Sequence, residues 1–543
     1  MQIVTAEIVG RVRAVVGAGA VAAAVAVGLP ACGWAQGDLE GQAPVVAEAV
    51  LPGTAAGAPG SGAARARGAR SARARTVAPA SYTAPTSEAE LENDVGLMLD
   101  SRVRSGTWGA IVVSLTRGDT LYSINADNEL QPASNMKLFT TALALDQFGA
   151  EHQFSTDVLR SGYLAADGTL HGNLVLRGGG DPGLSSRYYQ GGASAAMDVL
   201  SQLVADAGVK RVTGSIIADA TAFEGELVPD GWLDRYLQSS YAARVSALSL
   251  NDNIVLVAVE PGKNGHAAIV SLEPASDIPV ASSVRTVAGK RGGRIIVRNT
   301  SRGTVEVRGW IGSRSDTRRY QLVVEKPALF TAGAFRHALA ARGITVTGST
   351  VLGKTPLGAR MVTSLASPPL DRLVSAMNRE SINHFAELLF RDAGRAGSSD
   401  GVGSAADANA LLQRFMTEKV GARPGSVLAA DGSGLSVLDR VTPRSLVQLL
   451  AYAHQSPWSD AFHASLPVAG ESELLRHRMR RTPAEGNLHA KTGTTNNIIS
   501  LGGYVTARDG ELLAFALIYN GHDRWRARQA IDQVGATLAG FTR

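Results

Sequence analysis

A serine and a lysine three residues apart, Ser134 and Lys137, form the pattern with the clearest chemical use in this sequence. The apolar spacing of the residues that follow, up to Gly149, predicts a buried helix with Ser134 at its N-terminus. Residues three apart on a helix are about 5–6 Å from each other, so the amine of Lys137 can reach the Ser134 hydroxyl and take its proton. The free N–H groups of the first turn also favour an oxyanion beside Ser134. This stretch therefore predicts a nucleophile, its base and part of an oxyanion hole.

Taken alone, Ser-x-x-Lys leaves an alternative open, in which Ser134 only caps the helix and Lys137 is a solvated side chain. Serine is a preferred residue at helix N-termini, so the pattern also occurs without a catalytic role. Two further patterns bear on the choice. One is Ser381-Ile382-Asn383, in a region of helical periodicity that begins near Pro369, and the other is Lys491-Thr492-Gly493, which precedes strand-like residues 498–505.

The Lys-Thr-Gly tripeptide occurs once, in a chain with only eight lysines. A strand of small residues lets the backbone of a substrate lie against it as an added strand. Lys491 and the hydroxyls of Thr492 and Thr494 are then placed to receive a carboxylate. The alternative is that this is only an edge strand with an exposed lysine. That alternative does not explain why Ser-x-x-Lys, Ser-x-Asn and Lys-Thr-Gly all occur in the chain, in this order.

Ser-x-Asn is the least specific of the three patterns, because it also occurs at 123–125 and 249–251. The first of these lies in a predicted hairpin of strands 108–115 and 120–124, and the second in a β-rich stretch. Ser381 and Asn383 instead lie in the helical region between the serine–lysine pair and Lys-Thr-Gly.

The composition is that of a globular protein, with 45% apolar and 19% charged residues. A chain of 543 residues is longer than a domain with a single hydrophobic core usually is, so two or three domains are expected. The formal net charge is +5, and residues 1–85 contribute +3 of it, so a nucleic-acid surface is not indicated. The single cysteine, Cys32, precedes the globular part, so no disulfide, zinc site or thiol nucleophile can form within 86–543.

The N-terminus predicts export. Arg11 and Arg13 precede an apolar run and small residues near Ala35, the pattern of a secretory signal peptide over 1–35. The alternatives are a buried helix or membrane anchor, for which the 16 residues from Ala14 are short, and a lipoprotein cut before Cys32. Residues 36–85 are rich in Ala, Gly, Pro and Arg and predict a disordered linker.

Short strand-like runs separated by turn residues extend from about 153 to 358, for example at 174–176, 215–217 and 254–259. We therefore expect a β-rich insert at 161–365, between two parts of a catalytic domain at 86–160 and 366–543. The first part should begin with a helix over 88–103, after a capping-box pattern at Ser87. Because the insert has the pattern of a self-contained core, we expect that a short linker can replace it without unfolding the catalytic part.

The order Ser-x-x-Lys, Ser-x-Asn, Lys-Thr-Gly is close to the signature of penicillin-binding proteins and serine β-lactamases. From about Leu91 to the C-terminus the chain resembles the D-alanyl-D-alanine carboxypeptidase/endopeptidase family, the class C low-molecular-mass penicillin-binding proteins. That family has a long insert between the first two motifs, and here 247 residues separate the two serines. Further shared motifs are Leu176-Arg177-Gly178-Gly179-Gly180-Asp181-Pro182, Ser246-Ala247-Leu248-Ser249-Leu250, Asp431-Gly432-Ser433-Gly434-Leu435-Ser436 and Ser465-Leu466-Pro467-Val468-Ala469-Gly470.

One residue departs from the family pattern, which usually has a polar residue in the middle of the second motif, where this chain has Ile382. In a locally extended segment, alternate side chains face opposite ways. Ser381 and Asn383 can then face the cleft while Ile382 turns away, so the departure affects substrate preference more than chemistry.

The resemblance implies an α+β fold of the serine β-lactamase/transpeptidase type, an antiparallel sheet flanked by helices, with the cleft between the Ser134 helix and the Lys491 strand. It implies an acyl-enzyme at Ser134, formed after Lys137 takes the proton, with a lysine pKa lowered by partial burial and by Lys491. The remaining implied roles are proton relay by Ser381, an oxyanion site at the N–H groups of Ser134 and Thr494, and substrate binding by Asn383, Lys491, Thr492, Gly493 and Thr494.

The implied substrates are peptidoglycan stem peptides and cross-links in the periplasm of a bacterial cell envelope, with β-lactams as covalent inhibitors. No cofactor or metal is called for, no nucleic acid is expected, and membrane association should be peripheral at most. The alternatives are a β-lactamase or esterase on the same scaffold and a catalytically silent peptidoglycan-binding protein. The sequence leaves open the balance of carboxypeptidase and endopeptidase action, the diamino acid of the peptide and the oligomeric state.

Overall fold

The computed structural model of the chain describes residues 82–100, 103 and 105–543. The predicted signal peptide at 1–35, Cys32 and the predicted linker up to residue 81 lie outside the described residues. Among the helices of the described part, none combines the length and apolar character needed to cross a membrane.

The catalytic part is built on a five-stranded antiparallel sheet in the order β18-β19-β20-β1-β2. The N-terminal hairpin pairs with C-terminal strands, because β1 runs alongside β20 from Thr107 opposite Asn520 to Ser114 opposite Leu513. The predicted hairpin and the predicted strands after Lys491 are confirmed. The strands are β1 Thr107–Ser114, β2 Thr120–Ile124, β18 His489–Thr494, β19 Ile498–Thr506 and β20 Leu512–Asn520.

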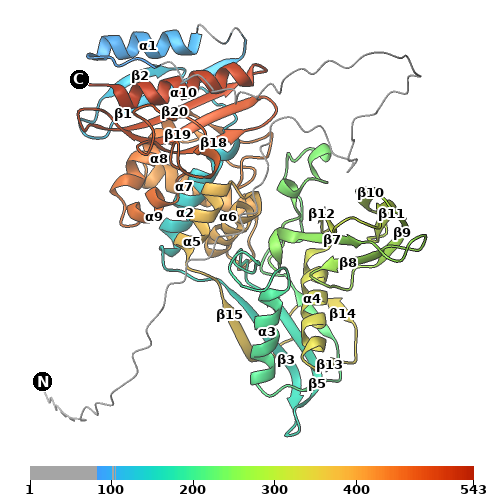
Figure 1. Cartoon of the computed structure of the whole chain (residues 1–543). Helices are drawn as coiled ribbons and strands as arrows, with labels where there is room; N and C mark the ends of the chain where they lie inside the picture. Colours follow the sequence, from blue (N-terminus) through green and yellow to red (C-terminus); the bar gives the residue numbers. More distant parts are fainter. Residues whose placement is uncertain (1–81, 101–102, 104) are drawn as a thin grey trace, which may run out of the picture. The chain divides into compact units, whose positions relative to one another are not determined.

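Helices cover both faces of this sheet (Figure 1). On one face lie α1 Glu88–Asp100 and α10 Arg524–Gly540. Since both faces are covered, β19 and β20 are almost continuously buried rather than alternating. On the other face lie α2 Met136–Phe148, α5 Leu370–Glu380, α6 Asn383–Gly397, α7 Ala405–Glu418, α8 Pro443–Gln455 and α9 Ser459–Ala464.

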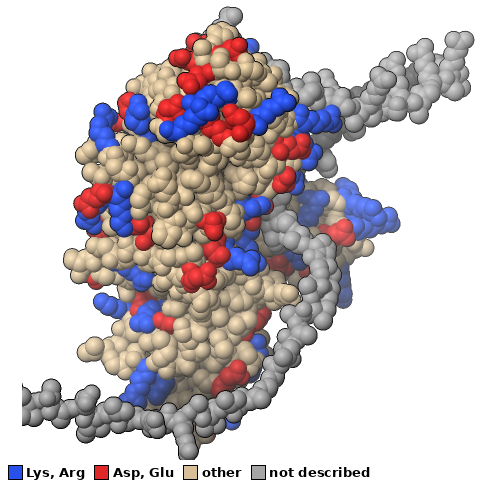
Figure 2. Space-filling model, turned by 90° about the vertical axis from the view of Figure 1, so that its left-hand side faces the viewer, with Lys and Arg blue, Asp and Glu red and all other residues tan. Residues whose placement is uncertain are grey.

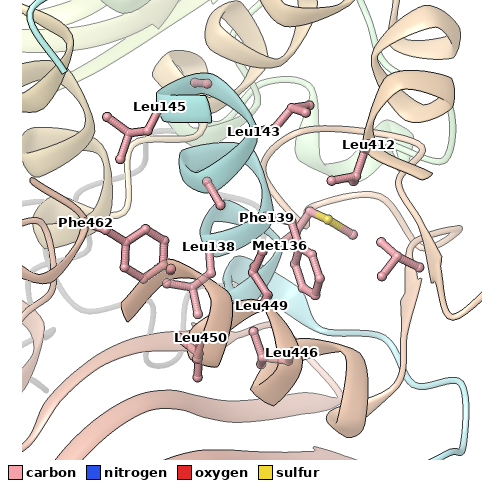
Figure 3. Close-up of a cluster of buried hydrophobic side chains, with 14 of the residues drawn as sticks. Met136, Leu138, Phe139, Leu143, Leu145, Leu412, Leu446, Leu449, Leu450 and Phe462 are labelled. Carbon is pink, nitrogen blue, oxygen red and sulfur yellow. The ribbon is translucent and has the colours of Figure 1, made fainter. Parts of the chain in front are cut away.

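Helix α2 is buried nearly all round, not only on the one face that its spacing predicts. Figure 3 shows its side chains Met136, Leu138 and Phe139 among leucines of α8 and α7 and Phe462 of α9. Each such side chain contributes roughly 1.5–3 kcal/mol when fully buried. The helix that follows Ser134 is therefore fixed in the middle of the core.

The insert contains a seven-stranded sheet. The chain enters this sheet through β3 and leaves it through β15, which lies next to β3. The predicted border at 160/161 falls inside β3, which pairs with β4 from Thr156 to Leu164. Because Ser155 lies opposite Ala366, the change of sheet occurs near 154 and 367. The strands are β3 Ser155–Leu164, β4 Thr169–Gly178, β5 Arg211–Val212, β6 Ile216–Asp219, β13 Thr345–Val346, β14 Thr350–Leu352 and β15 Arg360–Ala366.

Two smaller three-stranded sheets and two helices complete the insert. The predicted strands at 174–176, 215–217 and 254–259 correspond to β4, β6 and β7, so the β-rich character is confirmed. The sheets are β12-β7-β8, from Arg318–Val323, Ile254–Glu260 and Ile269–Glu273, and β10-β11-β9, from Gly293–Asn299, Val305–Gly312 and Val280–Val287. The helices, which the strand pattern does not predict, are α3 Ala195–Asp206 and α4 Pro327–Ala341.

Candidate active site

Ser134 lies in a single 3₁₀ turn, η1 Ala133–Asn135, which runs directly into α2 at Met136. Ala133 has a positive φ of 48°, a strained conformation for a residue with a side chain. Lys137 is in the first turn of α2, and its Nζ lies 3.1 Å from Ser134 Oγ. The predicted contact between the two side chains is therefore present, and Lys137 is fully buried rather than solvated.

The amine of Lys137 has three polar neighbours, which suits a base. Its Nζ donates to Asn383 Oδ1 at 2.6 Å and to the carbonyl oxygen of Ser433 at 2.8 Å. A neutral amine has two hydrogens and one lone pair. With both hydrogens given to these acceptors, the lone pair is left to face Ser134 Oγ.

Burial lowers the pKa of Lys137 to about 8. The buried carboxyl groups of Asp431, Glu387 and Asp439 act in the opposite direction and limit this decrease. Lys491 is expected to lower the pKa of Lys137, but it is not among the groups that shift this pKa. The influence runs the other way, because burial and the charge of Lys137 hold the pKa of Lys491 well below its usual range. With this pKa, roughly a tenth of Lys137 is neutral at pH 7 and the neutral share grows as the pH rises, which is the form that a general base requires.

Ser381 and Asn383 converge on the two lysines, although the segment is not extended throughout. Ser381 ends α5 in the left-handed conformation at φ 59°, Ile382 is extended, and Asn383 begins α6. Ile382 packs into the hydrophobic core. The expected division, in which the polar residues face the site and Ile382 turns away, is produced by this tight turn between two helices.

Lys491 lies on β18 and is fully buried behind Ser381. Its Nζ donates to Ser381 Oγ at 2.9 Å and to the carbonyl oxygen of Thr492 at 2.9 Å. The lysine thus polarises the serine hydroxyl directly.

Gly493 allows β18 to approach the turn that carries Ser134. A Cβ at this position would lie 2.1 Å from Ser500 Oγ and 2.8 Å from the carbonyl oxygen of Pro132. Ser500 Oγ donates to that same carbonyl at 2.7 Å and fixes the distance between β19 and the turn. The glycine of Lys-Thr-Gly is required here by space.

The loop of residues 431–436 also lies in the site, although its sequence alone does not place it there. Asp431 accepts hydrogen bonds from the N–H groups of Ser433, Gly434 and Ser436, which folds the loop around its carboxyl group. This turns the Ser433 carbonyl toward Lys137. The motif Asp-Gly-Ser-Gly, a turn-forming sequence, was the available signal.

The insert also contributes to the site. Trp232 Nε1 donates to Asp431 Oδ2 at 2.7 Å, and Asn383 Nδ2 donates to the carbonyl oxygen of Tyr241 at 2.8 Å. Trp232 belongs to a small cluster that includes Leu388 of α6. These contacts argue against the expectation that a short linker can replace residues 161–365, because that change would expose Leu388 and remove the Trp232 donor from the buried carboxyl group of Asp431.

Trp232→Phe is expected to lower stability by about 1–3 kcal/mol, because it removes a donor from a buried carboxyl group. It should also slow acylation and shift its pH midpoint, since the loop that orients Lys137 loosens. Trp108→Phe is the matched control, because Trp108 Nε1 is buried without a partner among the described residues. Melting temperature and acylation rate against pH are the measurements, and an unchanged pH midpoint would leave Trp232 with a structural role only.

A serine in contact with a buried lysine, beside a lysine-bearing edge strand of an antiparallel sheet between two helical layers, defines a serine acyl-transfer enzyme of the penicillin-binding protein and β-lactamase class. Residues 93–540 match the D-Ala-D-Ala carboxypeptidase 3 (S13) family. The chain belongs to that family and is a serine-type hydrolase, which confirms the family predicted from the motifs.

Sequence similarity to two D-alanyl-D-alanine carboxypeptidases supports the family assignment. The chain is 32% identical to the D-alanyl-D-alanine carboxypeptidase of Actinomadura sp. (strain R39) over 469 residues, 83% of this chain and 85% of that protein. It is 25% identical to D-alanyl-D-alanine carboxypeptidase DacB of Haemophilus influenzae, over 76% of this chain and 85% of the relative.

The fold is that of a solved penicillin-binding protein. The crystal structure of penicillin binding protein 4 from Haemophilus influenzae matches with a TM-score of 0.68 at 22% identity, covering 81% of this chain and 98% of that one. The same protein complexed with a β-lactam matches with a TM-score of 0.63 at 23% identity, over 82% and 98% of the two chains. The predicted fold class is therefore confirmed.

Proposed function

We propose that the protein is a D-Ala-D-Ala carboxypeptidase, endopeptidase or both, which cleaves peptidoglycan stem peptides and cross-links through an acyl-enzyme at Ser134. The observation that carries this is the position of the Lys137 amine, whose hydrogens are taken by Asn383 and Ser433 and whose third neighbour is Ser134 Oγ. Family membership supports the choice of substrate.

In the acylation step, Ser134 Oγ attacks the carbonyl carbon between two D-alanines while its proton moves to Lys137 Nζ. The oxyanion is stabilised by the N–H groups of Ser134 and Thr494. Collapse breaks the C–N bond. Ser381, polarised by Lys491, passes its proton to the departing amine, and its oxygen is reprotonated with the proton that Lys137 took from Ser134. Lys137 is then neutral again, and the acyl group remains as an ester on Ser134.

In the deacylation step, a water attacks the ester carbonyl and Lys137 accepts a proton from the water. The C–O bond to Ser134 breaks, and Ser134 Oγ recovers its proton. Thr492 and Thr494 receive the substrate carboxylate with Lys491 behind them, Gly493 keeps the strand close, and Asn383 binds the amide backbone. A β-lactam enters by the same attack and remains as an adduct.

This chemistry belongs in the bacterial cell envelope, where peptidoglycan lies. The signal-like pattern over 1–35 supports export, and periplasmic location follows from it as part of the proposal. Mass spectrometry of the exported protein should find a start near Gln36, and an intact Met1 or a lipid on Cys32 would contradict that location.

The function is tested by incubating the purified protein with a fluorescent penicillin and, separately, with a pentapeptide that ends in D-Ala-D-Ala. A lasting fluorescent adduct and released D-alanine are expected. Rapid turnover of the penicillin would instead identify a β-lactamase, and absence of both adduct and D-alanine would identify a silent binding protein.

A further inference from the structure

The charged residues are distributed very unevenly along the chain, although its net charge is small. Residues 261–323 contain eleven Lys and Arg against four Asp and Glu, a net charge of +7, although the whole chain carries only +5. Over most of the face drawn in Figure 2, blue and red residues are interspersed. The excess of positive charge lies in the part of the insert that contains the sheet β10-β11-β9.

The strand register places much of this charge on one face. Arg294 of β10 lies opposite Trp310 of β11, and Trp310 lies opposite Arg285 of β9. Residues directly opposite one another share a face of a sheet, and alternate residues point the other way. The inner face holds Ile295, Val307 and Val284, which are buried, so the row Arg294-Trp310-Arg285 crosses the outer face.

Two of the cations on this side have no acidic partner in the described part of the chain. Glu306 is the one acidic residue of the three strands, and it pairs with Arg298 and Arg308. Exposed Arg285 and Lys290 are left without a carboxylate, and Lys290 Nζ lies 5.2 Å from the centre of the Trp310 ring. A cluster of like charges around an aromatic ring is suited to an anion supplied from outside.

We propose that the outer face of β9, β10 and β11 binds a strand of the peptidoglycan polymer, with the cations on the carboxylates of uncleaved peptides and Trp310 against a sugar ring. The inference rests on the proposed function, because the polymer is the substrate of that function. Ala281 and Ser283 are the small residues beside Glu306 and Arg308 on this face, so it offers an extended polymer a flat strip. Holding the polymer raises the local concentration of its peptides at Ser134.

A charge-reversed pair of residues tests the surface. The variant is Arg285→Glu with Lys290→Glu in the full chain, and the matched control is Lys210→Glu with Arg211→Glu. The control makes the same change in net charge at two exposed residues beside β5 of the same insert. Binding is measured by co-sedimentation with insoluble peptidoglycan at low and raised salt, and by flotation with vesicles of phosphatidylglycerol and phosphatidylcholine.

The wild-type protein should sediment with peptidoglycan, less so at raised salt. The Arg285/Lys290 variant should bind at least about tenfold more weakly, since two charge-assisted contacts are lost, and the control should bind like the wild type. Trp310→Ala should also weaken binding, without a change of charge. Trp525→Ala, which removes an exposed tryptophan outside the insert, should leave binding unchanged. Penicillin acylation should be equal in all of these variants.

The proposal is overturned if the Arg285/Lys290 variant sediments like the wild type, if the control loses as much binding, or if the wild type binds vesicles and not peptidoglycan. These results do not depend on the catalytic assignment. A wild-type protein that sediments but neither acylates nor releases D-alanine would contradict the proposed function and leave the binding surface supported.

Discussion

Ser134→Ala is expected to abolish both penicillin acylation and D-alanine release while the protein stays folded. The reason for the loss is that Ser134 Oγ is the atom that forms the ester, and no other hydroxyl lies in its position against Lys137 Nζ in the described part of the chain. The reason that the fold survives is local. The residue before α2 is Asn135, whose side chain makes no capping bond, so α2 does not depend on Ser134 as a cap.

The cost in stability should therefore stay near 1 kcal/mol, the size of one hydrogen bond to a polar group. Ser123→Ala is the control, because Ser123 is an exposed serine of β2 and has no lysine three residues after it. Labelling, D-alanine release and melting temperature are measured on the same preparations. A Ser134→Ala protein that still acylates, or that is inactive only because it has unfolded, would remove the basis for the proposed nucleophile.

The sequence predicts the site where its parts are local or ordered along the chain. Ser134 and Lys137 are one turn apart, so their contact follows from helix geometry alone. Lys-Thr-Gly precedes two apolar strands, and its place on an edge strand of the sheet follows from that pattern. The hairpin of β1 and β2 is predicted for the same reason, because turn residues separate two strand-like runs.

The parts that the sequence does not predict depend on long-range packing. Trp232 and Tyr241 contact Asp431 and Asn383 across more than a hundred residues, and neither has a local signature. The burial of Lys491 is equally invisible in the sequence, since a lysine on an edge strand is usually solvated. The predicted border at 160/161 falls inside β3, because only the pairing of this strand with β4 and β15 assigns it to the insert, and that pairing leaves no local signal in the sequence.

Lys137 is the residue for which this packing matters most. Its Cα lies within α2, which is buried nearly all round, and its Nζ is placed by Asn383 of α6 and by the loop around Asp431. The helix alone brings the amine near Ser134. The two other elements orient it and keep water away, which lowers its pKa to about 8.

Acylation by the wild-type protein should accordingly become faster as the pH rises through about 8 and then level off. The sign follows from the chemistry, because only the neutral amine can accept the proton of Ser134, and the neutral fraction grows as the pH rises through the pKa. The rate constant for penicillin acylation, measured from pH 6 to pH 10, gives the profile. A rate that falls over this range would show that Lys137 acts in its charged form.

Lys137→Ala should slow acylation by at least ~10²–10⁴, the contribution of a positioned general base. The loss should exceed this range if the lysine also orients Ser134, and the residual rate should no longer rise near pH 8. Truncation leaves Asn383 Oδ1 and the Ser433 carbonyl without their donor, so a stability loss of about 1–3 kcal/mol is expected beside the kinetic effect. Lys354→Ala, at an exposed lysine, is the control for removal of a charge. If the Lys137→Ala protein keeps both the wild-type rate and the rise with pH, another group takes the proton, and the buried amine must be assigned a structural role.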